Sequence, residues 1–360
     1  MSQPVPSTSP LCDRCQRSMR PSQVSGLLHL RFPTPHAQAK VVQSLKNLCD
    51  EVKICSGVVT IPFSGEDGIA LFPQLTQILT PLEQEDVKVL FQPQGKEMNL
   101  SDYFAVEPMK RFWARYQSVW LIDVLEGNHL FSLFQPIVAA QSLEVFAYEC
   151  LLRGRLADQV ILPGQLFEAA RNAGMVFQLD VAARFAAIRG AAEHGIQQKV
   201  FVNFLPNSIY DPQNCLRSTM TLLNQLGLSC RQVVFEVVES DRVTDIDHLR
   251  NILNFYRKEG FEVALDDLGA GYSSLNMLHE LRPNYVKLDM GLVQNVSGDR
   301  YKGLIAEKLI ETAHLLEVQV IAEGIECRED YEWLRQRQVN YVQGYYFARP
   351  AVPPPLPQAF

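Results

Sequence analysis

The stretch that decides the fold is residues 261–289, which read FEVALDDLGAGYSSLNMLHELRPNYVKLD. Two short apolar runs, 263–265 and 285–288, are separated by a glycine-rich turn and a helical segment. The first run ends on two adjacent carboxylates, Asp266 and Asp267. Like charges this close resist joint ionisation unless a cation intervenes, and a hard divalent cation bound by oxygen ligands is the usual partner. A solvated Asp-Asp turn is the alternative for this stretch alone, so the rest of the chain must decide between them.

Composition favours an ordinary globular protein with one large domain and one smaller one. The chain has 360 residues, of which 47% are hydrophobic and 20% charged. A net charge of −7 argues against a nucleic-acid polymer as the main partner. No apolar run approaches the ~18 residues of a membrane helix, and the N-terminal letters MSQPVPSTSP lack the features of a signal peptide. The eight cysteines are therefore expected to be reduced thiols of a cytoplasmic protein that does not bind membranes.

From Phe131 onward, strand patterns alternate with helical ones, which predicts an α/β domain over residues 127–352. The expected strands are 131–138, 145–152, 199–205, 233–238, 262–267, 285–289, 318–323 and 341–347. Eight such strands with helices between them predict a (β/α)₈ TIM-like barrel, whose active site gathers at the C-terminal strand ends. The connection 139–144 is too short for a crossover helix, so the first strand must be antiparallel to the second.

The remaining segments flank this barrel. Residues 1–24 are rich in Pro, Ser and Gln and are expected to be disordered, and 353–360 form a proline-rich tail. Residues 25–106 predict a small α/β module of sensory or regulatory type, and the aromatic, amphipathic stretch 107–126 predicts a connecting helix. Within the module the expected elements are strands at 27–32, 58–61 and 87–91 and helices at 37–52 and 72–79.

The N-terminal cysteines raise the question of a structural zinc site. Cys12 and Cys15 form a CxxC pair, and Cys49 and Cys55 could complete a set of four thiolates. Five residues separate the second pair, and Cys49 falls within an expected helix. Free thiols are therefore the favoured interpretation, with zinc as the alternative.

Polar residues recur at the ends of the expected barrel strands. They are Glu149, Asn203, Glu236, Asp266, Asp267, Lys287, Glu323 and Gln343. The five acids, together with the amide of Asn203 and the amine of Lys287, match the needs of two hard cations. Two such ions about 4 Å apart serve phosphoryl transfer, in which a deprotonated water attacks phosphorus in line with the leaving oxygen. Lys287 would hydrogen-bond that water, or alternatively only balance the charge of Asp266 and Asp267.

Residues from about 130 to 350 resemble the EAL family of cyclic di-GMP phosphodiesterases. The motifs that carry the resemblance are FQPIV from Phe134, ECLLR from Glu149, VN at Val202, EVVE from Glu236, DDLGAGYSS from Asp266, KLD from Lys287, AEGIE from Ala322 and QGY from Gln343. Their order and separations make the resemblance specific.

The resemblance implies a barrel that opens cyclic di-GMP to linear pGpG with two Mg²⁺ or Mn²⁺ ions. It assigns one ion to Glu149, Asn203, Glu236 and Asp266, and the other to Asp266, Asp267 and Glu323. It also implies four catalytic residues: Lys287, Glu323, Gln343 and Glu239. Of these, Glu239 would tether the loop 268–274. Gln135 and Arg153 would contact the substrate. The family also implies a homodimer through residues 268–281.

The sequence departs from the family pattern at several positions. The signature triplet reads Glu149-Cys150-Leu151, with cysteine in place of alanine, and Leu268 replaces the usual phenylalanine. The usual Arg-Trp-x-His-Pro stretch is replaced by RGRLAD at 153–158. These changes keep open a second hypothesis, in which a catalytically weak or inactive receptor binds cyclic di-GMP or a protein partner and signals through the N-terminal module.

Overall fold

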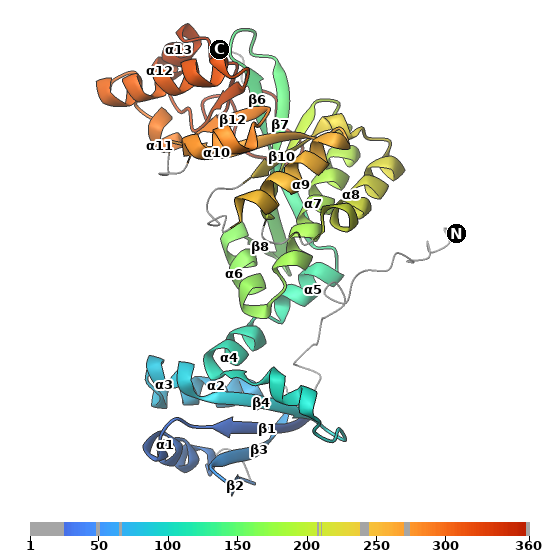
Figure 1. Cartoon of the computed structure of the whole chain (residues 1–360), viewed down its shortest axis with the longest axis vertical. Coiled ribbons are helices and arrows are strands. Elements are labelled where there is room, and N and C mark those ends of the chain that lie inside the picture. Colours follow the sequence, from blue (N-terminus) through green and yellow to red (C-terminus); the bar gives the residue numbers. More distant parts are fainter. Residues whose placement is uncertain are drawn as a thin grey trace. The chain divides into compact units, whose positions relative to one another are not determined.

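The computed structural model describes residues 25–47, 51–64, 67–206, 209, 211–237, 245–269 and 274–357. The described chain divides into two compact units (Figure 1). One contains the residues up to His129 together with Gly164–Val176, and the other contains Leu130–Pro163 and the residues from Phe177 onward. None of the helices in the described ranges combines the length and apolar character that crossing a bilayer requires.

The first unit is built on an antiparallel sheet with the strand order β2-β3-β1-β4-β5. Its strands are β1 (Ser25–Arg31), β2 (Lys53–Cys55), β3 (Val58–Ser64), β4 (Lys88–Pro93) and β5 (Glu107–Pro108). Its helices are α1 (Pro35–Leu45), α2 (Asp67–Ile78), α3 (Pro81–Asp86), α4 (Met109–Gln117), α5 (Trp120–Glu126) and α6 (Pro163–Ala173), with a 3₁₀ turn at Leu100–Ala105.

Two sequence-based boundaries in this unit are wrong. The helix expected over 37–52 ends at Leu45, and the exposed edge strand β2 follows it. The single helix expected over 107–126 is two helices, α4 and α5, because the chain turns at Ser118, whose hydroxyl bonds back to the carbonyl of Ala114. Short edge strands carry few apolar residues, so hydrophobic pattern does not reveal them.

Aromatic rings hold the core of the first unit together. The ring of Phe63 lies edge-on to Phe72, Phe91, Phe112 and Tyr116, with centroids 5.8–6.2 Å apart. Such edge-to-face contacts contribute beyond the burial of apolar area. The sheet and the helices α2 and α4 therefore share one hydrophobic cluster.

Replacing Phe63 with alanine is expected to cost about 3–5 kcal/mol of unfolding free energy, since the cavity would remain between rings that cannot all move inward. Urea denaturation followed by circular dichroism measures this loss. Phe104→Ala is the matched control, because the Phe104 side chain is 87% exposed and should change stability by no more than about 0.5 kcal/mol. A loss below about 1 kcal/mol for Phe63→Ala would contradict the packing described.

The second unit is a closed barrel of eight strands. They are β6 (Leu130–Ala139), β7 (Val145–Leu156), β9 (Lys199–Phe204), β10 (Val233–Val237), β11 (Glu262–Leu268), β12 (Tyr285–Leu288), β13 (Gln319–Ala322) and β14 (Tyr341–Val342). β6 is antiparallel to both β7 and β14, and the other neighbours are parallel. The prediction of an antiparallel first strand is confirmed. A short strand, β8 (Gln159–Ile161), extends β7 as a hairpin.

The final barrel strand is shorter than the sequence indicates. It ends at Val342 rather than residue 347, because the chain then turns to pair with the segment after β13. Ile325 donates to the carbonyl of Gln343, and Tyr346 donates to the carbonyl of Ile325. Gly344 permits this approach, since a Cβ there would lie 2.0 Å from the Ile325 oxygen.

Alternation along the strands separates an outer core from an inner one. Outward residues of the strands join one large cluster with apolar residues of the surrounding helices. These helices are α7 (Val176–Glu193), α8 (Pro212–Leu226), α9 (Ile246–Lys258), α10 (Ser274–Leu281), α11 (Met290–Val293), α12 (Arg300–Leu315) and α13 (Arg328–Gln336). Inward residues form a separate apolar layer: Ile137, Ala147, Phe201, Val234, Ala264, Tyr285 and Ile321. The barrel interior is therefore filled by side chains at this level rather than open.

Candidate functional site

A polar layer lies on top of this apolar one, and the two-residue repeat of the strands explains it. Each parallel strand places its next inward residue one step closer to its C-terminal end. For each of six strands, the residue two positions after the apolar-layer residue is polar: Glu149, Asn203, Glu236, Asp266, Lys287 and Glu323. The reversed strand β6 contributes Gln135, two positions before Ile137. The strand register places Glu236 opposite Asn203 on β9, and opposite Ala264, two residues before Asp266, on β11.

Lys287 is the centre of the layer. Its Nζ lies 2.6 Å from Glu323 Oε1, 2.8 Å from Glu236 Oε1, 3.3 Å from Asp266 Oδ1 and 3.4 Å from Glu149 Oε1. The lysine side chain is 1% exposed, and that of Glu236 is fully buried. Three strands (β7, β10 and β11) and the residue after β13 thus each bring one carboxylate to a single ammonium. The structure brings these five side chains together, while their roles stay predictions.

The electrostatics of this group show a shortage of positive charge. Burial raises the pKa of Glu323 to about 8, despite the opposing effect of Lys287. Burial likewise raises the pKa of Glu236 well above its ordinary value, with Glu149 and Asp266 adding to the effect and Lys287 opposing it. Burial alone would lower the pKa of Lys287, but the surrounding carboxylates outweigh it and raise that pKa. One lysine is therefore insufficient to keep all these acids ionised.

Two adjacent acids face the same space because of a β-bulge. Opposite β12, β11 pairs Leu265 with Val286 and then Leu268 with Leu288, so the bulge gives β11 one extra residue. Asp267 has a φ of 57°, and its N–H donates to Asp266 Oδ1 at 3.1 Å. Regular alternation would send one of the two side chains out of the barrel, whereas a bulge re-aims it.

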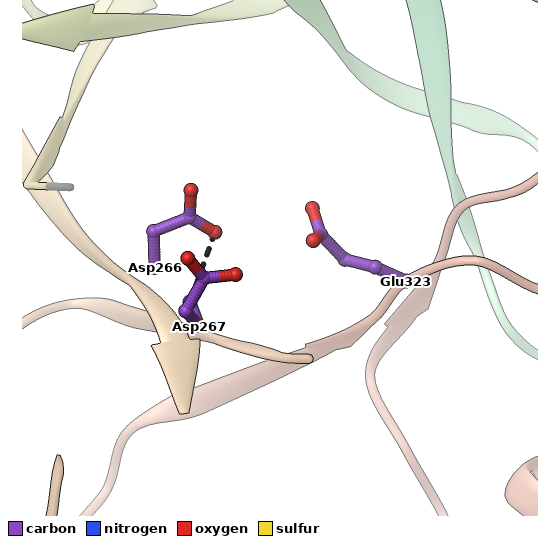
Figure 2. A group of neighbouring side chains, drawn as sticks. All are labelled: Asp266, Asp267 and Glu323. Carbon is purple, nitrogen blue, oxygen red and sulfur yellow. Dashed lines mark hydrogen bonds between the residues drawn. The ribbon is translucent and has the colours of Figure 1, made fainter. Parts of the chain in front are cut away.

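The bulge assembles a set of oxygen ligands. Carboxylate oxygens of Asp266, Asp267 and Glu323 lie within 4.8 Å of one another. Figure 2 shows the three side chains directed toward one another, the two aspartates from β11 and the glutamate from the segment after β13. This spacing suits a hard cation with oxygen ligands.

Hydrogen bonds tie the first, last and second barrel strands together at the same level. Gln343 Nε2 donates to Glu149 Oε2 at 2.6 Å and to Gln135 Oε1 at 3.1 Å. Gln135 in turn donates to the carbonyl of Ala348 at 3.3 Å. Gln343 Oε1 is buried without a hydrogen-bond partner among the described residues. Gln343 therefore fixes the Glu149 carboxylate and still offers a buried acceptor.

Two expected residues are not joined to the charged group. Arg153 lies four residues beyond Glu149 on β7, opposite Phe131, and its guanidinium donates to the carbonyl of Leu152 at 2.7 Å. Asn203 is half-buried beside Glu236 in the register, and its amide group makes no hydrogen bond to another described residue. Glu239 and most of the loop 268–274 lie outside the described residues.

The zinc alternative is not supported by the part of the chain that can be described. Cys12, Cys15 and Cys49 lie outside it, and Cys55 is an exposed free thiol. Cys150, the unusual member of the Glu149-Cys150-Leu151 triplet, is buried on the outer side of β7, where burial raises its thiol pKa well above the usual value. It lies in the outer core and leaves the Glu149 carboxylate undisturbed.

Sequence reasoning missed Arg155 at this end of the barrel. Its guanidinium lies over the ring of Phe131, 5.1 Å from the ring centroid. Arg155 shares the strand parity of Glu149 and Arg153, so the three side chains lie on one face of β7. The two-residue spacing of Arg153 and Arg155 in the sequence could have placed Arg155 on the face of Glu149.

The donor set fits a pair of divalent cations by charge and by chemistry. The five carboxylates carry a formal charge of −5 and Lys287 carries +1, which leaves −4, the charge that two divalent ions balance. Glu236 Oε2 is buried and has no hydrogen-bond partner within the described ranges. A buried carboxylate oxygen in that state needs a cation or a proton.

Comparison with known proteins relates this site to one family. The sequence model of the EAL domain matches residues 119–350. The chain is 28% identical over 233 residues to the probable cyclic di-GMP phosphodiesterase PdeG of Escherichia coli, covering 63% of this chain and 45% of PdeG. It is 25% identical over 218 residues to the blue light- and temperature-regulated antirepressor BluF of the same organism, covering 60% of this chain and 53% of BluF. The chain thus spans about half the length of these relatives.

A solved structure gives the same result. The standalone versatile EAL protein from Vibrio cholerae, in its c-di-GMP-bound form, is 35% identical with a TM-score of 0.59. The similarity covers 64% of this chain and 95% of that one, so nearly the whole of a free-standing EAL protein is represented here. With the family match extending over more than half of its residues, the chain belongs to the EAL domain family.

Proposed function

We propose that this protein hydrolyses cyclic di-GMP to linear pGpG with two Mg²⁺ or Mn²⁺ ions. The observation that carries the proposal is the group of four carboxylates around Lys287, with Asp267 beside Asp266 and Glu323; its formal charge of −4 is one that two divalent cations would balance. The relative PdeG is named a probable cyclic di-GMP phosphodiesterase, which supports the choice of substrate.

The proposed ligands divide into two overlapping sets. One ion would be held by Glu149, Asn203, Glu236 and Asp266, and the other by Asp266, Asp267 and Glu323. Asp266 is common to both because its carboxylate contacts Lys287 and also belongs to the cluster in Figure 2. When bound, such ions would stabilise charge on the phosphate oxygens and promote loss of a proton from an attacking water.

The chain's own groups would orient the reactants. Lys287 donates hydrogen bonds from a buried position and can hold a water for attack, or stabilise negative charge that develops on phosphate. Gln343 uses its amide nitrogen to fix Glu149 and can accept from the same water through Oε1. Gln135 and Arg153 would contact the nucleotide, with Glu239 as the tether of the loop after β11. The guanidinium of Arg153, at the end of a long side chain, can donate hydrogen bonds to a phosphate oxygen.

Metal exchange tests the proposal. Treatment with EDTA should abolish formation of pGpG, and Mg²⁺ or Mn²⁺ should restore it. Ca²⁺ should support at least about 100-fold slower turnover, because it prefers more ligands and longer bonds than Mg²⁺. The measurement is chromatographic separation of the nucleotide products from full-length protein. Equal turnover with EDTA and with Mg²⁺ would contradict a metal-dependent reaction.

A second candidate function is a receptor without turnover. The replaced stretch RGRLAD at 153–158 forms the end of β7 and the turn into β8, and the relative BluF is named an antirepressor rather than an enzyme. Incubating the purified chain with cyclic di-GMP and Mg²⁺ separates the two hypotheses. Micromolar or tighter binding without any pGpG would favour the receptor.

The homodimer through residues 268–281 stays a prediction. Of this segment the structure describes Leu268, Gly269 and α10, whose Met277, Leu278 and Leu281 are buried in the barrel's outer core. Sedimentation equilibrium of the full chain would measure the state of association. A monomer at micromolar concentration would contradict the dimer and leave the hydrolytic proposal unaffected.

A further inference from the structure

A buried ion pair lies on α7, away from the charged layer. Asp180 and Arg184 are one helical turn apart, and Arg184 Nη2 lies 3.2 Å from Asp180 Oδ2. Their side chains are 2% and 0% exposed. Replacing such a pair with apolar residues is often neutral or stabilising, so burial of the charges calls for another explanation.

The second oxygen of Asp180 supplies that explanation. Asp180 Oδ1 accepts from the backbone N–H of Leu205 at 2.9 Å. Leu205 follows the end of β9, where the last pair with β10 is Phe204 with Val237. The Asp180 carboxylate thus provides a hydrogen bond to the backbone just beyond the last β9–β10 pair. This bond lies two residues after Asn203.

Arg184 holds the carboxylate in place from the other side. Its Nη1 donates to Thr219 Oγ1 on α8 at 3.4 Å, so it joins the two helices that flank the loop after β9. Its Nε and Nη2 are buried without a hydrogen-bond partner in the described part of the chain, so its hold on Asp180 is the ion pair. A buried arginine that lacks some of its hydrogen bonds contributes little to the stability of the fold. Its position therefore favours a role in orienting Asp180.

We propose that Asp180 is a positioning residue for the metal site, which fixes the end of β9 so that the Asn203 amide faces Glu236. This inference rests on the proposed function, in which Asn203 binds one of the ions. Asn203 offers a neutral oxygen without the attraction of a charge, so its contribution depends on how firmly its strand end is held. Groups that orient ligands in this way typically affect metal affinity by about 10–100-fold.

Two double variants isolate the hydrogen bond to Leu205. Asp180→Leu with Arg184→Met removes the ion pair and the acceptor, whereas Asp180→Asn with Arg184→Met removes the ion pair but keeps an amide oxygen that can accept from Leu205. Both lose the Arg184 contact with Thr219 equally. The Leu/Met protein should bind Mn²⁺ about 10-fold or more weakly, and the Asn/Met protein should stay within about 3-fold of wild type.

Mn²⁺ binding is measured by electron paramagnetic resonance of the full-length protein without nucleotide. The Mn²⁺ concentration for half-maximal hydrolysis should rise in parallel, with kcat at saturating Mn²⁺ largely retained. Equal Mn²⁺ affinity in the two double variants, whether normal or weakened, would overturn the proposal. Because this titration needs no turnover, failure of the hydrolytic function in the wild-type chain would be seen separately.

A third variant covers the case in which the Leu/Met protein does not fold. Leu205→Pro removes the donor N–H and leaves α7 unchanged, and the preceding Phe204 is already extended as a residue before proline prefers. It should weaken Mn²⁺ binding as the Leu/Met change does. Wild-type Mn²⁺ affinity in a folded Leu205→Pro protein would overturn the proposal.

Discussion

Asp266→Asn is expected to reduce hydrolysis of cyclic di-GMP by about 10³-fold or more. Asp266 is the carboxylate that both proposed ions share, and its Oδ1 also lies 3.3 Å from Lys287. Loss of its charge removes several kcal/mol of transition-state stabilisation, at about 1.4 kcal/mol for each factor of ten. The amide keeps the shape of the side chain, so circular dichroism and melting temperature should stay close to wild type.

Asp247→Asn is the matched control for that experiment. Asp247 lies in the first turn of α9, its side chain is 81% exposed, and it forms a surface ion pair with Arg250. Surface pairs contribute little to stability, so this variant should keep full activity. Retention of more than about a tenth of the wild-type rate by Asp266→Asn, under saturating Mg²⁺, would contradict the metal assignment.

Lys287→Met is expected to destabilise the metal-free protein by about 3–5 kcal/mol, the usual cost of breaking a buried ion pair by removing one partner. Four carboxylates lie within 3.4 Å of its Nζ, and methionine would leave them without a cation. Added Mg²⁺ should recover part of the loss, because ions that bind only the folded state stabilise it by mass action. Hydrolysis should remain strongly impaired even with Mg²⁺.

Thermal unfolding with EDTA and with Mg²⁺ measures both effects of Lys287→Met. Lys308→Met provides the comparison, since Lys308 is 61% exposed on α12 and pairs only with Glu311 among the described residues. The melting temperature of Lys308→Met should equal that of the wild-type protein, both in EDTA and in Mg²⁺. If Lys287→Met melted like wild type in EDTA, the lysine would not be the counter-charge of the buried acids.

Much of the barrel could be predicted because its signals are local. Apolar runs such as 233–237 and 285–288 are strands in the structure, and the short connection 140–144 forced β6 and β7 to be antiparallel. The polar layer followed from the same runs, since an acid at an inward position of a buried strand requires partners at the same height.

Other features depend on contacts that no local pattern records. The bulge in β11 that brings Asp267 beside Asp266 arises from pairing with β12, and the early end of β14 arises from the approach of Gly344 to Ile325. In the sequence Asp180 is one acid within a long helix, and only the fold brings its carboxylate to the backbone N–H of Leu205. Tertiary pairing decides such features, whereas hydrophobic period decides the elements themselves.

The most direct test is a crystal structure of the full chain grown with Mn²⁺ and analysed by anomalous diffraction. Two anomalous peaks about 4 Å apart are expected in the polar layer, with Asp266 as a ligand of both. Glu149, Asn203 and Glu236 should complete one coordination shell, and Asp267 and Glu323 the other. No Mn²⁺ peak at these side chains, with Lys287 still contacting all four of its carboxylates, would contradict the two-ion site.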